Sequence, residues 1–201
     1  MDLRAEIRTV GRRRVLTGLF MLFLHGVGLF GLFTFIAPLL TMVSGFPPAE
    51  VPLLLLLFGI GAIVGSLLSG RLADWRLELS IAIVFIAQVL LYLLFGFFAG
   101  NTVAMYFLMV VLGIVGMAAA APIRAFILNA ARDAPSLAAT FSSSAFNLGV
   151  AVGSTICSVA LASGASYAQL PWLGVICSSA GLAIIRMTPS TRPRRTVPDT
   201  P

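Results

Sequence analysis

Long runs without a charged residue alternate with short polar segments along the chain. Residues 15–49, 79–123 and 134–185 contain no Arg, Lys, Asp or Glu. A helix needs about 20 apolar residues to cross the hydrocarbon core of a bilayer, so the last two runs are each long enough for two crossings. The pattern predicts an all-α integral membrane protein with six transmembrane helices. We expect the spans at about 15–40, 51–70, 80–98, 103–128, 137–163 and 171–187.

Basic residues gather on one side of these six expected spans. All 13 are arginines. Five lie in residues 1–14, three lie in the segments after the second and fourth spans, and four lie at or after the end of the sixth. The remaining one, Arg124, lies within the fourth span, toward the end on the same side. Positive residues favour the cytoplasmic side. We therefore expect a plasma (inner) membrane protein with both termini in the cytoplasm. Residues 1–14 fit either an amphipathic surface helix or a solvated basic flank, and residues 188–201 fit a disordered tail.

A glycine-rich pattern occurs twice. Residues 58–66 match residues 146–154 at Phe, two Gly, Val and Ser positions, 88 residues apart, with Gly61 and Gly65 corresponding to Gly149 and Gly153. The first and fourth spans both carry Ala-Pro near their ends, 84 residues apart. Three spans per copy would place the copies in opposite orientations. We therefore expect a 3+3 inverted repeat, a design that recurs among transporters.

Composition excludes a soluble domain, because 59% of the residues are hydrophobic and only 10% are charged. The net charge of +6 does not indicate nucleic-acid binding, since the arginines lie at span edges and form no patch. Cys157 and Cys177 lie inside expected spans without metal-ligand spacing, so we interpret them as small apolar side chains. No cofactor or metal site is expected.

Three segments resemble the C-terminal half of the major facilitator superfamily, and in particular the bacterial drug:proton antiporters of the arabinose and sugar efflux type. These are residues 33–38 (FTFIAP), 70–74 (GRLAD) and 145–149 (AFNLG). The resemblance implies that spans 1 and 4 face a central cavity, spans 2 and 5 meet the other half, and spans 3 and 6 face lipid. It also implies alternating access, a small-molecule substrate and a second six-span half.

Two features depart from the family pattern. These 201 residues contain no counterpart of the family's first six spans with their proton-coupling carboxylates, and Trp75 to Glu78 replaces the usual basic run after the loop motif. We expect half of an efflux-type transporter that needs a second half on the same or another chain, with protons as a candidate coupling ion. A non-transporting membrane partner or an inert fragment are the alternatives. An intramembrane serine protease is rejected, because the fourth span has no Ser and the sixth no His.

The candidate cavity residues are those with polar or adaptable side chains inside spans. His25 could bind substrate or a proton, or could be hydrogen-bonded to a neighbouring helix. Arg124 fits both a contact to an anionic group and simple snorkelling to the interface. Met109 and Met117 fit an adaptable pocket or core packing. The remaining candidates for hydrogen bonding in the cavity or between helices are Thr34 and Asn147.

Asp74 is the candidate for a latch at the cytoplasmic face. It could pair with Arg132 or cap a helix near Ser136, and either contact would hold the second, fourth and fifth spans together. A solvated loop charge is the other interpretation. Gly61, Gly65, Gly149 and Gly153 are expected to let neighbouring helices approach closely.

Overall fold

The computed structural model of the chain describes residue 9 and residues 11–188, and every element in that part is helical. Most of the basic N-terminal segment and the tail from residue 189 lie outside the described residues. The elements are α2 (Arg13–Phe33), α3 (Ile36–Met42), η1 (Pro48–Glu50), α4 (Val51–Asp74), α5 (Leu77–Phe98), α6 (Thr102–Ala118), α7 (Ala120–Ala130), α8 (Pro135–Ala162), η2 (Tyr167–Gln169) and α9 (Pro171–Met187).

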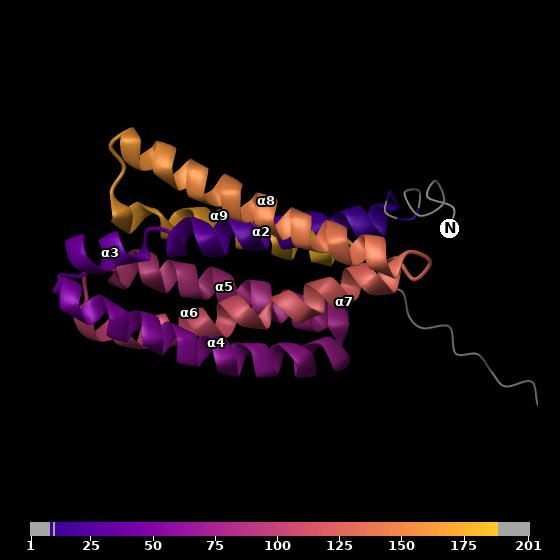
Figure 1. Cartoon of the computed structure of the whole chain (residues 1–201), viewed down its shortest axis with the longest axis horizontal. Coiled ribbons are helices and arrows are strands. Elements are labelled where there is room, and N and C mark those ends of the chain that lie inside the picture. The colour runs from indigo at the N-terminus through magenta and orange to yellow at the C-terminus, as the bar shows by residue number, and fades with distance from the viewer. Residues whose placement is uncertain (1–8, 10, 189–201) are drawn as a thin grey trace, which may run out of the picture.

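These elements make six crossings that are long and apolar enough to span a membrane. α2 and α3 form the first crossing, α6 and α7 form the fourth, and the others each consist mainly of one helix. The crossings lie side by side along the long axis of the molecule (Figure 1). The predicted all-α membrane fold with six spanning helices is confirmed.

The second crossing is longer than the sequence suggested. α4 continues to Asp74 and only Trp75 and Arg76 separate it from α5, so Arg71 lies in the last turn of a helix and not in a loop. Cationic side chains are favourable in a last turn, where the helix dipole is negative. The change from apolar to charged residues therefore marks the membrane boundary and not the end of the helix.

Two crossings are interrupted near their prolines. The first breaks at Thr34 and Phe35, before Pro38, and the fourth breaks at Ala119, before Pro122. Proline lacks an N–H group and its ring crowds the carbonyl four residues earlier, which disrupts the preceding turn. The repeated Ala-Pro therefore marks a kink within each crossing, and the helix resumes beyond it.

The inverted repeat appears as one helix contact that occurs twice. A Cβ atom at Gly61 or Gly65 of α4 would overlap the carbonyl oxygens of Val110 or Ile114 of α6. At Gly149 or Gly153 of α8 it would overlap those of Phe23 or Val27 of α2. The glycines correspond at an offset of 88 residues and the carbonyls at 87. Each close pair joins one helix of the first repeat to one of the second, as an inverted repeat requires.

The third and sixth crossings pack against each other. α5 packs along α9, with Gly174 against the ring of Tyr92 and Gly181 against the ring of Phe85. By contrast, α4 and α8 are the least buried of the six crossings. The chain therefore has two largely uncovered helices, each attached by glycine contacts to a helix with a break.

Candidate functional site

Thr34 lies at the break of the first crossing, with its side chain exposed. Its hydroxyl donates to the carbonyl oxygen of Phe30 at 2.7 Å and lies 2.8 Å from the Ser154 hydroxyl of α8. Because Thr34 has only one hydroxyl proton, Ser154 is the donor in the second contact. A polar contact between α2 and α8 is thus exposed at membrane depth.

Asn147 is exposed on α8, and its side chain makes no hydrogen bond within the described part of the chain. Its neighbour Phe146 faces inward, with its ring 5.7 Å from that of Phe30 and 5.9 Å from that of His25. Asn147 therefore belongs to the uncovered face of α8, at the level of these aromatic contacts.

Asn147 is one member of a polar stripe that the sequence reasoning missed. The stripe follows one side of α8 at helical spacing. Its signal in the sequence is a Ser, Thr or Asn at steps of three or four positions, with one step of seven between Asn147 and Ser154. Polar side chains at membrane depth normally face protein or a water-filled cavity and not lipid. The stripe consists of Ser136, Thr140, Ser143, Asn147, Ser154 and Ser158.

His25 is buried between helices and is not on the uncovered face. Its Nδ1 lies 2.9 Å from Nε2 of Gln88 on α5, and Oε1 of Gln88 accepts a 3.2 Å hydrogen bond from Ser178 on α9. All three residues are buried. Because an amide N–H donates to Nδ1, that ring nitrogen carries no proton in this arrangement. The geometry agrees with the interpretation of a histidine bonded to a neighbouring helix.

The two candidate methionines occupy different environments. Met109 is fully buried in the main hydrophobic cluster, among residues such as Leu29 and Leu112. Met117 is half-buried on α6, two residues before the break at Ala119. Met109 therefore packs in the core of this chain, and Met117 lies where the fourth crossing bends.

Arg124 is exposed on α7, two residues after Pro122. Its guanidinium makes no hydrogen bond or ion pair within the described residues. It lies six residues before the last residue of α7, Ala130, and therefore about 9 Å from that end at 1.5 Å rise per residue. Both a solute contact and snorkelling fit this position.

Ser69 is a second polar residue that the sequence reasoning did not assign. It is buried on α4, and its hydroxyl donates to the carbonyl oxygen of Ala118 at 3.0 Å while accepting from the N–H of Ala121 at 3.0 Å. Both backbone groups flank the break in the fourth crossing. A serine in a run of apolar and small residues gives no sign of such a hydrogen bond, because its partner depends on how two helices pack.

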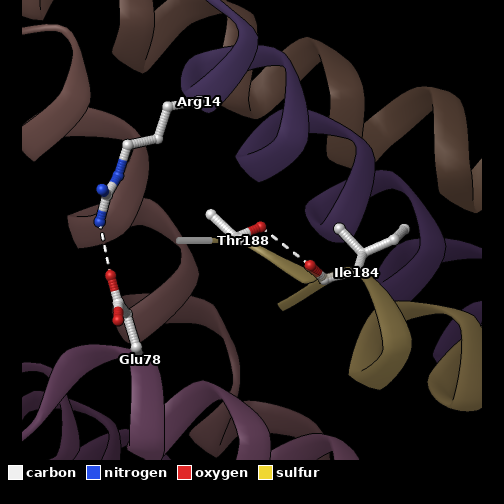
Figure 2. A network of polar contacts seen from close by, with 4 residues as sticks. All are labelled: Arg14, Glu78, Ile184 and Thr188. Atoms are coloured by element: carbon white, nitrogen blue, oxygen red, sulfur yellow. Dashed lines mark hydrogen bonds and ion pairs between the residues drawn. The ribbon is translucent and has the colours of Figure 1, made fainter. Parts of the chain in front are cut away.

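The expected pairing of Asp74 with Arg132 is not present. Ion pairs at this end of the described structure instead link Arg12 to Asp133 at 2.8 Å and Arg14 to Glu78 at 2.6 Å. Figure 2 shows the second pair beside Thr188, whose hydroxyl donates to the Ile184 carbonyl near the end of α9. The start of α2 thus reaches both the start of α5 and the turn before α8. Since α4 remains helical up to Asp74, its carboxylate is not on a loop that could turn toward Arg132.

A different contact closes the opposite end of the bundle. The Tyr106 hydroxyl of α6 donates to Oε2 of Glu50, directly before α4, at 2.9 Å. Ser44, in the turn after α3, donates to the carbonyl oxygen of Ala99 at 2.6 Å. The described residues contain no group of three or more His, Cys, Asp or Glu side chains placed to hold a metal ion.

Comparison with known proteins gives relatives of one kind. The inner membrane transport protein YdhP of Escherichia coli K12 is 28% identical over 192 residues, which cover 96% of this chain and 49% of that protein. The putative transporter AraJ of the same organism is 29% identical over 78% of this chain and 40% of its own length. A probable sugar efflux transporter of Helicobacter pylori J99 is 28% identical over 89% of this chain and 45% of its own length.

The chain spans about half the length of the curated relatives it matches. The family model described as Major Facilitator Superfamily matches residues 2–157, which is most of the chain. Six spanning helices, paired by glycine contacts that occur in both halves of the sequence, agree with that match. The chain belongs to the Major Facilitator Superfamily.

Proposed function

We propose that this chain forms one half of a secondary active, efflux-type transporter of small solutes, working by alternating access with a second six-span half. The observation that carries the proposal is the polar stripe on α8, together with the exposed Thr34 beside it. Polar side chains at this depth favour a water-filled path or another protein surface over lipid. A second half covering α4 and α8 would provide both.

We assign the solute contacts to the exposed or half-buried candidates: Thr34, Met117, Arg124 and Asn147. His25 and Met109 are buried behind them, so we assign them to holding α2 and α6 in place. Asp74 and Arg132 remain latch candidates for a different conformation of the transporter. Two relatives are named a probable sugar efflux transporter and, in Streptomyces lividans, a chloramphenicol resistance protein, and these names support a small organic solute.

Protons are the proposed coupling ion, but this chain offers few groups to carry them. Within the described residues, acidic side chains lie only at the ends of crossings or in the turn before α8. They are Glu50, Asp74, Glu78 and Asp133. A carboxylate in the interior would therefore come from the second half. The basic end, with Arg12 and Arg14, is assigned to the cytoplasm of a cell with an inner membrane.

Reconstitution into liposomes tests the proposal. The chain is prepared alone and with a candidate first half, such as the first six spans of YdhP, and uptake of a labelled sugar and of chloramphenicol is measured under an imposed pH gradient. Transport by the pair, or by the chain alone as a self-associated half, supports the proposal. Stable co-purification without transport supports a non-transporting partner subunit. If no half gives transport or stable co-purification, the result supports an inert fragment.

A further inference from the structure

The break in the fourth crossing leaves particular backbone groups without helical partners. Pro122 has no N–H, so the carbonyl of Ala118, four residues earlier, cannot make its usual hydrogen bond to that position. α6 ends at Ala118 and α7 begins at Ala120. In a membrane, each backbone group without a partner is costly, because no water is at hand to replace the bond.

Ser69 of α4 provides the replacement. Its hydroxyl donates to the Ala118 carbonyl at 3.0 Å and accepts from the Ala121 N–H at 3.0 Å, so a single oxygen satisfies groups on both sides of the break. The residue is 3% exposed, which leaves little room for water to take its place. The contact belongs to the same series as those of Gly65 and Gly61, which meet α6 one and two turns earlier on α4.

The equivalent position in the other repeat provides a natural comparison. Cys157 follows Gly153 on α8 as Ser69 follows Gly65 on α4. It faces Gly31 of α2, where a Cβ atom would lie 3.3 Å from its sulfur. α2 is helical there, since its break comes later, at Thr34. The Gly31 carbonyl also precedes a break, since the N–H of Phe35 bonds to Leu32 and not to Gly31. The two positions therefore differ in the side chain: Ser69 bonds across the break in the fourth crossing, whereas Cys157 packs against α2 ahead of the break in the first.

We propose that Ser69 is a positioning residue that replaces the backbone hydrogen bonding lost at Pro122, and so fixes the direction in which α7 carries Arg124. The role of Ser69 in placing Arg124 for solute transport deepens the proposed function and rests on it. Its role in hydrogen bonding at the break, the structural part, does not rest on it, because it concerns only contacts within this chain.

Amide hydrogen exchange of a peptide covering residues 118–124, in the purified full chain in nanodiscs, tests the structural part. Ser69→Ala should speed exchange of the Ala121 amide about tenfold, since this N–H loses its acceptor. Ser66→Ala is the matched control, because Ser66 lies on the same helix, is exposed and makes no such bond. Equal exchange in Ser69→Ala and Ser66→Ala would overturn the inference.

A Pro122→Ala background separates a role at the break from general packing. The substituted alanine would supply the missing N–H to the Ala118 carbonyl, so the effect of Ser69→Ala should fall to about twofold or less. The same large effect in both backgrounds would contradict the inference. If Ser69→Ala alone does not accumulate in membranes, accumulation of the Ser69→Ala/Pro122→Ala double variant supports the inference, and failure of both contradicts it.

The direction of α7 is read at Arg124 itself. In an Arg124→Cys chain, Ser69→Ala should change the rate of labelling by a charged, membrane-impermeant thiol reagent at least about threefold, whereas Cys157→Ser and Ser66→Ala should not. Unchanged labelling would contradict the positioning role. Where a partner half gives transport, Ser69→Ala in the chain that keeps Arg124 should lower the transport turnover as well as change the labelling rate at position 124. Absence of transport with every half would reject the proposed function and leave the exchange and labelling results to decide the structural part.

Discussion

Nδ1 of His25 lies 2.9 Å from Nε2 of Gln88, and this contact ties the first crossing to the third. Ser178 extends it to the sixth crossing through the oxygen of the same amide. Three helices that otherwise meet through apolar side chains and glycines therefore share one buried polar network. Such a network sets their relative position, because every shift would leave a polar group without its partner.

Replacing Gln88 should destabilise the bundle through this network. Gln88→Leu keeps most of the volume but leaves His25 Nδ1 and the Ser178 hydroxyl without partners, at a cost of about 1–3 kcal/mol in the free energy of unfolding. Denaturant unfolding in micelles measures it, with the exposed Leu90→Ala on the same helix as control. The double variant His25→Leu/Gln88→Leu should lose less than the sum of the two single changes. Strict additivity would show that the contact contributes nothing.

The two glycine contacts should respond alike to substitution. Gly61→Ala and Gly149→Ala each place a methyl group against a carbonyl oxygen of the facing helix, and overpacking of this kind costs about 1–3 kcal/mol. Gly70→Ala is the control, since nothing lies within 4 Å of its Cβ position and alanine favours helix by about 1 kcal/mol. Unfolding in micelles gives all three values. A large effect at only one of the two contacts would contradict their equivalence.

The two ion pairs should contribute differently to the free energy of unfolding. Arg14 and Glu78 are 28% and 27% exposed, and the Arg14 guanidinium also lies 4.8 Å from the centre of the Phe126 ring. Glu78→Gln should therefore cost up to about 1 kcal/mol. Asp133→Asn breaks the more exposed pair with Arg12 and should cause no measurable loss. Melting temperatures at low and high salt test this order, and a larger loss for Asp133→Asn would reverse it.

The solute assignment predicts variants that lose transport without losing stability. Thr34→Val and Asn147→Leu remove hydrogen-bonding groups from the exposed face and should lower transport by the reconstituted pair about tenfold. Thr155→Val is the control, because its hydroxyl bonds to the Ala151 carbonyl within α8. Unfolding midpoints should be the same for Asn147→Leu and Thr155→Val, and Thr34→Val should lose only the contribution of its hydrogen bond to Ser154. Transport equal to that of the control would remove Thr34 and Asn147 from the solute path.

Membrane orientation can be tested directly by thiol labelling. Trp75→Cys lies between α4 and α5, at the arginine-rich end, and Gly100→Cys lies between α5 and α6, at the opposite end. An impermeant reagent added to intact cells should label position 100 and not position 75, and inverted vesicles should show the reverse. Labelling of position 75 in intact cells would invert the assigned topology.

The number of crossings and their repeat could be predicted from sequence, because the hydrocarbon core imposes strict requirements. Uncharged runs must be about 20 residues long, and glycine at Gly61 or Gly149 has few roles in a membrane helix other than close packing. These constraints act on single helices or on neighbouring pairs. Such constraints determine which residue types occur at which positions in the sequence, so the spans and the repeat can be predicted without coordinates.

Polar partners could not be predicted, because they depend on how helices are rotated and displaced against one another. His25 was recognised as a candidate, but nothing in its surroundings in the chain indicates Gln88. The Asp74–Arg132 pair is not formed in this structure and stays a prediction for another conformation. Long arginine side chains such as Arg12 and Arg14 can each reach several carboxylates, so small differences in distance decide which pair forms. Ser69 could be interpreted from the sequence only as a small residue at a helix contact, and its hydrogen bonds to Ala118 and Ala121 could not be predicted for the same reason.

The pairing of α4 with α6 and of α2 with α8 has a consequence for biosynthesis. Each pair joins a helix made early by the ribosome to one made later. Until α8 leaves the translocon, the carbonyl groups of Phe23 and Val27 do not have Gly149 and Gly153 beside them, and α2 lies in the lipid without this contact. A nascent chain that stops after α5 would therefore insert α2 and α4 without the close helix contacts that α8 and α6 provide later.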